Sequence, residues 1–200
     1  MTLKKTGDVL YVRAGLDPAE RKRLSRYKGC TVLSLHEVAT DDLEIAHELP
    51  RLEHLQLYDT RIADWSSLTR IQTLRRLFVN GVKQLDQLAV VSQLPQIRQL
   101  GLANLHTLTK LPDLSACTQL REVRVWNCKR LEDLSALLGA EGLEAVTLVG
   151  IPYVPSELER LLARPRLAYL HATFGSKRAN DEFSSLLARH GKQRRLAEPA

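Results

Sequence analysis

A short phrase of apolar residues recurs along almost the whole chain, and its regular spacing strongly constrains the fold. In the copy Leu120-Arg-Glu-Val123-Arg-Val125, apolar residues stand at positions 1, 4 and 6, and position 9 is Cys128. Eight copies align, with first residues at 7, 30, 52, 74, 97, 120, 143 and 167, so the spacing stays between 22 and 24 residues. This period predicts a solenoid, because a single unit cannot bury its apolar face and must stack on its neighbours.

The phrase Leu-x-x-Leu-x-Leu resembles that of leucine-rich repeats, in particular the short internalin-like class of about 22–23 residues. The resemblance covers roughly residues 7–175. It implies an α/β horseshoe with one parallel sheet of about eight strands on the concave face. Short helices and turns are expected on the convex face, with helical caps at both ends.

One departure from that family concerns position 9, where an asparagine usually holds the turn backbone. Here position 9 is occupied by Gly15, Val38, Thr60, Val82, Leu105, Cys128, Ile151 and Gly175. We expect the apolar side chains in this column to extend the core. We expect the offset Asn104 and Asn127 to form local hydrogen bonds.

The unbroken period predicts a single domain over residues 1–200, and the strands should be parallel and in register. An N-terminal cap containing a weak first repeat should occupy 1–29, the repeats 30–175, and a capping helix with a tail 176–200. The expected strands are Val9–Arg13 and the segments near 32–36, 54–58, 76–80, 99–103, 122–126, 145–149 and 169–173. Short helices or turns are expected to begin at Asp41, at Asp64 and at Ser156, and to cover 87–94 and 133–139.

Both ends carry helix signals. Asp17-Pro18-Ala19-Glu20 has the pattern of a helix start, with the helix running to about Lys28. Near the other end, Asn180 should cap a helix that ends at Gly191 and seals the core with Phe183, Leu186 and Leu187. The tail Lys192–Ala200 is expected to be frayed.

The net charge of +6 and the isoelectric point of about 9.4 suggest nucleic-acid binding, but the charge distribution does not support it. Residues 1–28 contain eight basic and three acidic residues, residues 177–200 contain six and three, and the repeats between them carry −2. The repeat body is therefore not expected to track phosphates. Solvated caps are the simpler interpretation, and contact of the caps with nucleic acid or an acidic membrane is the alternative.

The three cysteines show no disulfide or zinc spacing and are predicted to be buried, so neither a metal site nor a cofactor is predicted. Reduced cysteines indicate a cytoplasmic protein. The first residues, Met1-Thr-Leu-Lys-Lys, lack the apolar segment of a secretory signal, and no run is long enough to span a bilayer.

Side chains alternate along a strand, so positions 1, 4 and 6 should point inward, whereas positions 3, 5 and 7 should face the concave side. Tyr58, Phe78 and Trp126 are large aromatics on that face, where the core does not need them. Aromatic and arginine side chains dominate protein interfaces. The predicted partner-binding residues are His36, His54, Tyr58, Arg76, Phe78, Asn80, Gln99, Gly101, Glu122, Arg124, Trp126 and His171.

A repeat with small outward side chains lies between the two aromatic groups. Gly101 and Ala103 belong to it, and one strand spacing of about 4.8 Å on each side predicts a slot about 10 Å wide for a partner side chain. The alternative is that Phe78 and Trp126 pack against each other or against a neighbouring loop, which would close the slot.

Catalytic motifs are absent from the sequence: it contains no Gly-x-Ser-x-Gly, no phosphate-binding Gly-x-x-x-x-Gly-Lys-Ser/Thr and no His-Glu-x-x-His. His36 and His54 should be displaced by about 13 Å along the strands, and Glu122 with Arg124 forms an ion pair more readily than a catalytic couple. An enzyme is therefore not predicted.

Two binding hypotheses remain. In the first, the chain binds one specific protein partner with an acidic contact surface through its concave face, similar to small bacterial immunity proteins that inhibit a toxin. No small-molecule substrate, specific nucleic acid or membrane is expected. The excess of arginine over lysine hints at a GC-rich bacterial source. In the second, the chain is an adaptor or scaffold that contacts its partners through the basic caps.

Overall fold

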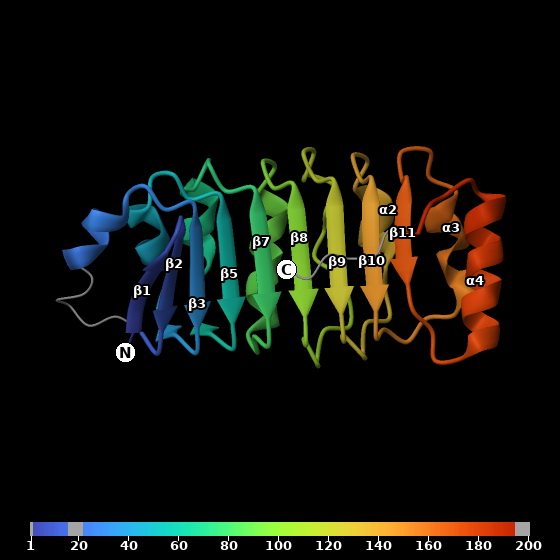
Figure 1. Cartoon of the computed structure of the whole chain (residues 1–200), viewed down its shortest axis with the longest axis horizontal. Coiled ribbons are helices and arrows are strands. Elements are labelled where there is room, and N and C mark those ends of the chain that lie inside the picture. Colours follow the sequence, from blue (N-terminus) through green and yellow to red (C-terminus); the bar gives the residue numbers. More distant parts are fainter. Residues whose placement is uncertain (1, 16–21, 195–200) are drawn as a thin grey trace.

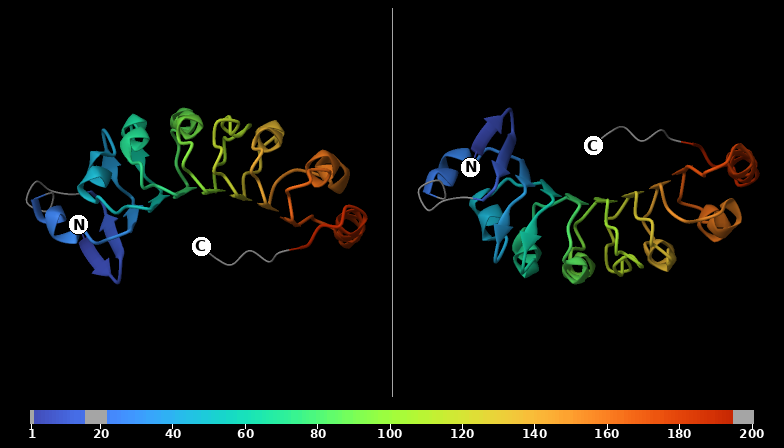
Figure 2. Two further views of the ribbon diagram at one scale, coloured as in Figure 1. Left: turned by 90° about the horizontal axis from the view of Figure 1, so that it is seen from above. Right: turned by 90° about the horizontal axis from the view of Figure 1, so that it is seen from below.

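The computed structural model describes residues 2–15 and 22–194, and in these ranges nine strands form one sheet along one side of a curved solenoid (Figure 1). The views along the sheet show the strands on the concave side and the short helices on the convex side (Figure 2). The strands are β1 (Thr2–Thr6), β2 (Val9–Arg13), β3 (Val32–His36), β5 (His54–Tyr58), β7 (Arg76–Asn80), β8 (Gln99–Ala103), β9 (Glu122–Trp126), β10 (Ala145–Val149) and β11 (Tyr169–Ala172). Two short strands, β4 (Ala39–Thr40) and β6 (Arg61–Ile62), pair beside this sheet.

The predicted parallel array is confirmed from β2 to β11, and its register follows the repeat. Leu100 pairs with Leu77 on one side and with Val123 on the other, so equivalent inward positions form continuous columns. These columns are the core: Leu77 and Leu100 are 1% exposed and Val123 is fully buried. Stacked repeats thus bury an apolar face that no single repeat could bury.

The first strand is a correction, because β1 precedes the expected Val9–Arg13 strand and runs antiparallel to it. The register pairs Thr6 with Val9, which leaves Gly7 and Asp8 as a two-residue loop, and Gly7 has a φ of 61°. A Gly-Asp pair between two short strands is a hairpin signal that the repeat alignment concealed, since it counted Gly7 as position 1.

Position 9 extends the core as predicted: Val38 and Val82 are at most 5% exposed, while Leu105 and Cys128 are fully buried. Cys30, Cys117 and Cys128 are all buried and free. Burial raises the pKa of the Cys117 thiol to about 11, so it has little thiolate character at neutral pH.

The backbone conformation at position 8 keeps the turns regular, and the sequence pattern did not predict this role for position 8. In the first seven copies the residue in this column has a left-handed backbone, with φ between 50° and 68°: Ala14, Glu37, Asp59, Gly81, Asn104, Asn127 and Gly150. In the first six copies, the position 8 N–H donates to the position 7 carbonyl of the next strand at 2.7–3.0 Å. The asparagines bond across repeats and not locally as expected: Asn127 Nδ2 donates to Asn104 Oδ1 at 2.6 Å, and Asn104 Nδ2 donates to Asn80 Oδ1 at 3.0 Å. The stacking of the repeats places these side chains next to each other although they are 23–24 residues apart in the chain.

The convex segments are short, and most are tight 3-10 helices. They are η1 (Leu24–Tyr27), η2 (Glu44–Glu48), η3 (Ser66–Arg70), η4 (Leu85–Gln93), α2 (Ser135–Gly139), η5 (Pro155–Leu158), α3 (Glu159–Leu162) and the longer α4 (Lys177–Arg189). The helix starts predicted near Asp41, Asp64, 87, 133 and Ser156 therefore lie within a few residues of the observed helices.

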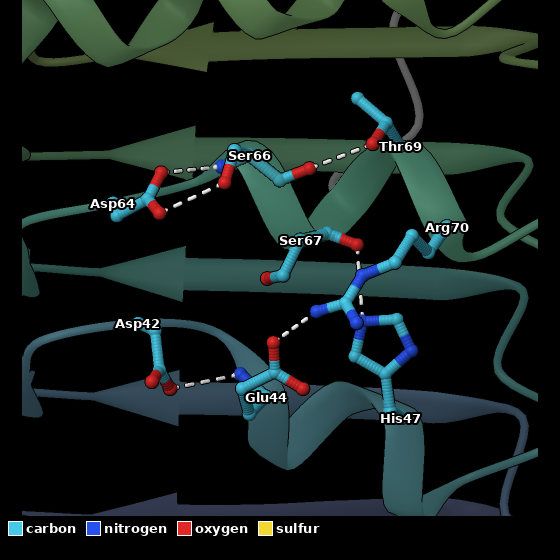
Figure 3. Close-up of polar contacts among 8 residues, drawn as sticks. All are labelled: Asp42, Glu44, His47, Asp64, Ser66, Ser67, Thr69 and Arg70. Carbon is cyan, nitrogen blue, oxygen red and sulfur yellow. Dashed lines mark hydrogen bonds and ion pairs between the residues drawn. The ribbon is translucent and has the colours of Figure 1, made fainter.

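Aspartates just before the convex helices hold their first turns. Asp64 Oδ1 accepts from the Ser66 N–H at 2.7 Å, and Asp42 Oδ1 accepts from the Glu44 N–H at 3.0 Å (Figure 3). Asp113 and Asp133 bond in the same way to the N–H two residues ahead, at 2.9 and 2.7 Å. Backbone and then side-chain hydrogen bonds from Ser66 and Ser115 keep the pKa of Asp64 and Asp113 below the ordinary value. At Asp133 the side chain of Ser135 lowers the pKa most, followed by its backbone N–H. The acidic residues here are parts of turns.

Neighbouring convex helices are also tied to each other. The His47 ring nitrogen Nε2 lies 3.0 Å from the Ser67 carbonyl oxygen, and Arg70 pairs with Glu44 across the same two helices, η2 and η3 (Figure 3).

The C-terminal cap begins earlier than expected. Ser176, not Asn180, caps α4: its Oγ accepts from the Ala179 N–H at 3.2 Å. Asn180 lies inside the helix and donates from Nδ2 to the Phe174 carbonyl at 2.9 Å. The sealing role predicted for the helix is confirmed, because Phe183 is fully buried, and the helix ends before Gly191, which has a φ of 62°.

The segment after α4 is ordered at its start, in contrast to the expected frayed tail. The Leu170 N–H donates to the Gln193 carbonyl at 3.1 Å, and the Gln193 N–H donates to the Ala168 carbonyl at 3.0 Å, so this segment covers the edge of β11. Lys192 Nζ donates to the Arg164 carbonyl at 2.7 Å. The predicted helix start at 17–20 and the remaining tail, 195–200, lie outside the described residues.

Candidate functional site

The concave face of the sheet carries all twelve predicted partner-binding residues. The register places Gln56 beside Phe78, Phe78 beside Gly101, and Gly101 beside Arg124, so one solvent-facing column crosses four neighbouring strands. His171 is the outlier, because it lies on β11, two strands beyond β9. The other eleven lie on β3, β5, β7, β8 and β9.

An aromatic row crosses this face, and we define it as Tyr11, His36, Tyr58, Phe78 and Trp126. The His36 and Tyr58 rings stack with centroids 4.5 Å apart and planes 8° apart. The Tyr58 and Phe78 centroids are 5.4 Å apart, and the Phe78 ring meets Trp126 at 6.1 Å with an edge-to-face geometry. Tyr11, 37% exposed, extends the row at 6.3 Å from His36; the sequence-based site omitted it, although it occupies position 5 of its strand.

The slot predicted at Gly101 does not exist, because the Phe78 ring fills it. A Cβ built on Gly101 would lie 2.5 Å from Phe78 Cδ2, and Phe78 is only 9% exposed. The aromatic ring leans over the glycine of the next strand and reaches Trp126, so the alternative interpretation was the correct one. The physical reason is burial: the ring removes apolar area from water above a backbone that has no side chain of its own.

Glu122 and Arg124 form the predicted ion pair, with Arg124 Nε 2.7 Å from Glu122 Oε1. Gln99 Nε2 donates to the other carboxylate oxygen, Glu122 Oε2, at 3.1 Å. The Glu122 carboxylate is nearly buried, at 8% exposure for the residue, so both of its oxygens need these donors. Arg124 is therefore already oriented by its own chain, whereas Arg76 on β7 is exposed.

The histidines on this face favour the uncharged form. Burial, with a smaller contribution from Arg76, lowers the pKa of His54 to about 4. Burial also lowers the pKa of His36, whose Nε2 lies 2.8 Å from Ser34 Oγ, and that of His171. At neutral pH these rings contribute little charge, and the positive charge of the face comes from arginines.

The polar side chains of this face form short contacts with one another. The contact between Ser34 and His36 has the residue types of a nucleophile and a base, but Ser34 is fully buried and its hydroxyl cannot meet a substrate. Among the described residues, no group of three or more His, Cys, Asp or Glu side chains could hold a metal ion. Within the same ranges, no helix is long and apolar enough to cross a bilayer.

Neither a protein-family model nor a curated protein sequence matches this chain. Among solved structures, the crystal structure of an internalin C2 from Listeria monocytogenes is similar, with a TM-score of 0.56 and 19% sequence identity. The match covers 78% of this chain and 74% of that one. At this identity the likeness concerns the fold alone, and it confirms the predicted leucine-rich-repeat solenoid.

Proposed function

We propose that this leucine-rich-repeat chain is a non-catalytic protein-interaction module that binds one protein partner through its concave face. The aromatic row is the observation that carries the proposal. It places Tyr58 and Trp126, both partly exposed, on a surface where the core has no use for them. Aromatic and arginine side chains contribute most to binding energy at protein interfaces, and Arg76 lies on the same strand as Phe78.

Rigidity supports the same proposal. Phe78 packs between Gly101 and Trp126, and Arg124 is paired with Glu122, so contacts within the chain restrict these side chains before binding. A surface that is ordered in advance loses little conformational entropy in a complex. Because the slot is closed, the partner is expected to lie across the aromatic row and not to insert a side chain at Gly101.

The partner that we propose has an acidic contact surface, because Arg76 is an exposed cation of this face and the histidines of the face favour the neutral form. The outward residues differ in every repeat, which suits one dedicated target better than a repetitive ligand. We therefore propose the role of an inhibitor, such as a cytoplasmic immunity protein that neutralises a bacterial toxin.

The test is capture of the partner from the source organism with two baits, the wild-type chain and the Tyr58→Ala/Trp126→Ala variant. A specific partner should be retained by the wild type, and calorimetry on the purified pair should show at least about tenfold weaker binding to the variant. Val154→Ala on the convex side, an exposed apolar residue, is the matched control and should bind normally. If the double variant binds its partner as tightly as the wild type, the contacts lie elsewhere and the adaptor hypothesis replaces this one.

A further inference from the structure

A row of arginines lines the edge of the sheet where the strands begin. Arg75, Arg98 and Arg121 occupy position 2 of three successive repeats, and we call them the arginine rim. Their backbones are neighbours, because the Arg98 N–H donates to the Arg75 carbonyl at 2.7 Å and the Arg121 N–H donates to the Arg98 carbonyl at 2.9 Å. Adjacent parallel strands lie about 4.8 Å apart, so the three side chains start from points only about 10 Å apart end to end.

Two of the three guanidinium groups are held in place by backbone carbonyls. Arg75 Nη1 donates to the Gln72 and Leu74 carbonyls at 2.7 and 3.1 Å. Arg121 Nη1 donates to the Leu120 carbonyl at 3.1 Å and approaches the Gly142 carbonyl at 3.4 Å. A Cβ on Gly142 would collide with this Arg121 nitrogen, so the glycine makes room for the cation.

Little negative charge neutralises these arginines. Arg121 Nε lies 3.3 Å from Glu144, an exposed ion pair, whereas Arg98 forms no side-chain hydrogen bond or ion pair with any other described residue. Arg76 follows Arg75 directly and is exposed at the concave face. Some acidic side chains of the repeats are occupied elsewhere: Glu122 binds Arg124, and aspartates of the convex turns bind backbone N–H groups.

The ends of the rim limit what it can bind. Position 2 is Glu53 in the repeat before Arg75 and Glu144 in the repeat after Arg121, and both are exposed. A long polyanion such as a nucleic acid would be repelled at both flanks, whereas a short anionic segment would not. Carboxylates three or four residues apart on a helix are spaced by about 5–6 Å, close to the spacing of the rim.

We propose that the arginine rim binds a short acidic segment of a protein, with carboxylates on one face of a helix pairing with Arg75, Arg98 and Arg121. This inference rests on the proposed function, since the rim borders the concave face at Arg76 and would bind part of the same partner. Planar guanidinium groups suit carboxylates because each can donate two parallel hydrogen bonds.

The probe is a fluorescent, helix-forming peptide with glutamates along one face, compared with its glutamine counterpart by anisotropy at physiological salt with the full chain. The glutamate peptide should bind at least about tenfold more tightly than the glutamine peptide. Arg98→Gln should weaken the glutamate peptide about fivefold, the upper end for one exposed ion pair. Thermal unfolding of this variant should be unchanged, since Arg98 has no polar side-chain partner among the described residues.

Lys83→Gln is the matched control, because Lys83 is an exposed cation beyond the other end of β7 and the charge removed is the same. Equal weakening by Arg98→Gln and Lys83→Gln would overturn the proposal and leave only overall charge. Tighter binding of an oligothymidylate than of the glutamate peptide would overturn it in favour of a nucleic acid.

The two proposals fail separately. Trp126→Ala should leave the affinity for the glutamate peptide unchanged, because Trp126 lies at the opposite end of its strand from Arg121. If no glutamate peptide binds, the rim proposal is wrong, while the concave-face proposal is still judged on the captured partner and its Tyr58→Ala/Trp126→Ala variant.

Discussion

At the scale of single residues, the shape of the concave face depends on two outward positions whose surroundings differ from those of the equivalent residues in other repeats. Gly101 is an outward residue without a side chain, and the ring of Phe78 occupies the space above it. Glu122 is an outward residue that is nearly buried, because Gln99 and Arg124 cover both of its oxygens. These two positions give the centre of the face its shape and rigidity.

Gly101→Ala should therefore destabilise the protein by about 1–3 kcal/mol, because the new methyl group forces the Phe78 ring away from Trp126. Urea unfolding measures this, and near-ultraviolet circular dichroism reports the changed environment of the tryptophan. Gly175→Ala is the matched control, since a Cβ there meets nothing within 4 Å. Equal stability of the two variants would show that Phe78 moves away at no cost.

His54 makes stability depend on pH. Its pKa in the folded state is about 4, below the unperturbed value of 6.5, because burial disfavours the charged ring. Between these values the unfolded chain binds more protons than the folded one, so this contribution is fully present above pH 6.5 and is lost as the pH falls towards 4. Urea titrations of the wild type and His54→Gln should show a smaller loss of stability in the variant over that window. Parallel curves would contradict the prediction.

At the scale of elements, the turn after each strand is the unit that keeps the repeats in register. In the first six repeats its left-handed residue at position 8 directs an N–H to the carbonyl of the next strand, so each of these turns is bonded to its neighbour. Glycine adopts this backbone easily, whereas a side chain needs compensation, and asparagine is among the residues that tolerate it best. Asn104 has two further bonds, one to Asn80 and one to Asn127.

Asn104→Ala should cost about 1–2 kcal/mol, because alanine keeps the strained φ of 53° and loses both side-chain bonds. Asn104→Gly should cost less, since it loses the same bonds but relieves the backbone. Comparing the two in urea separates the side-chain contribution from the backbone contribution. If glycine is the more damaging of the two, the backbone strain assigned to position 8 is wrong.

At the scale of the whole molecule, stability depends on closing the ends of an elongated core. The N-terminal edge is the β1–β2 hairpin, and the C-terminal edge is covered by α4 and by Gln193. Charge is also organised at this scale. Aspartates gather at the convex turns because those turns need acceptors, and the arginines of the rim gather where the strands begin.

Phe183→Ala should be severe, about 3–5 kcal/mol, because the side chain is fully buried and packs against Phe174 with ring centroids 5.3 Å apart. In a solenoid the loss should open the last repeats first, so amide exchange should accelerate most in β10 and β11. Tyr11→Ala, at the exposed end of the aromatic row, is the aromatic control and should change stability little. A uniform increase of exchange along the sheet would contradict this local opening.

The repeat pattern was sufficient to predict the solenoid, the register of eight parallel strands and the division into inward and outward positions. All of these follow from a period of 22–24 residues combined with the alternation of side chains in a strand, and both are local properties. The ion pair of Glu122 with Arg124 and the burial of Cys128 followed from the same reasoning.

What the pattern could not supply were contacts between residues that are one repeat apart or lie outside the repeat. The direction of the Phe78 ring depends on Gly101, which is 23 residues later in the chain, and no periodicity reports a rotamer. The same limit hid the arginine rim, because the net charge of −2 for the repeat body sums convex aspartates and rim arginines that the folded chain keeps apart. Burial of a ring and the separation of charges are properties of neighbours in space, and only folding brings those neighbours together.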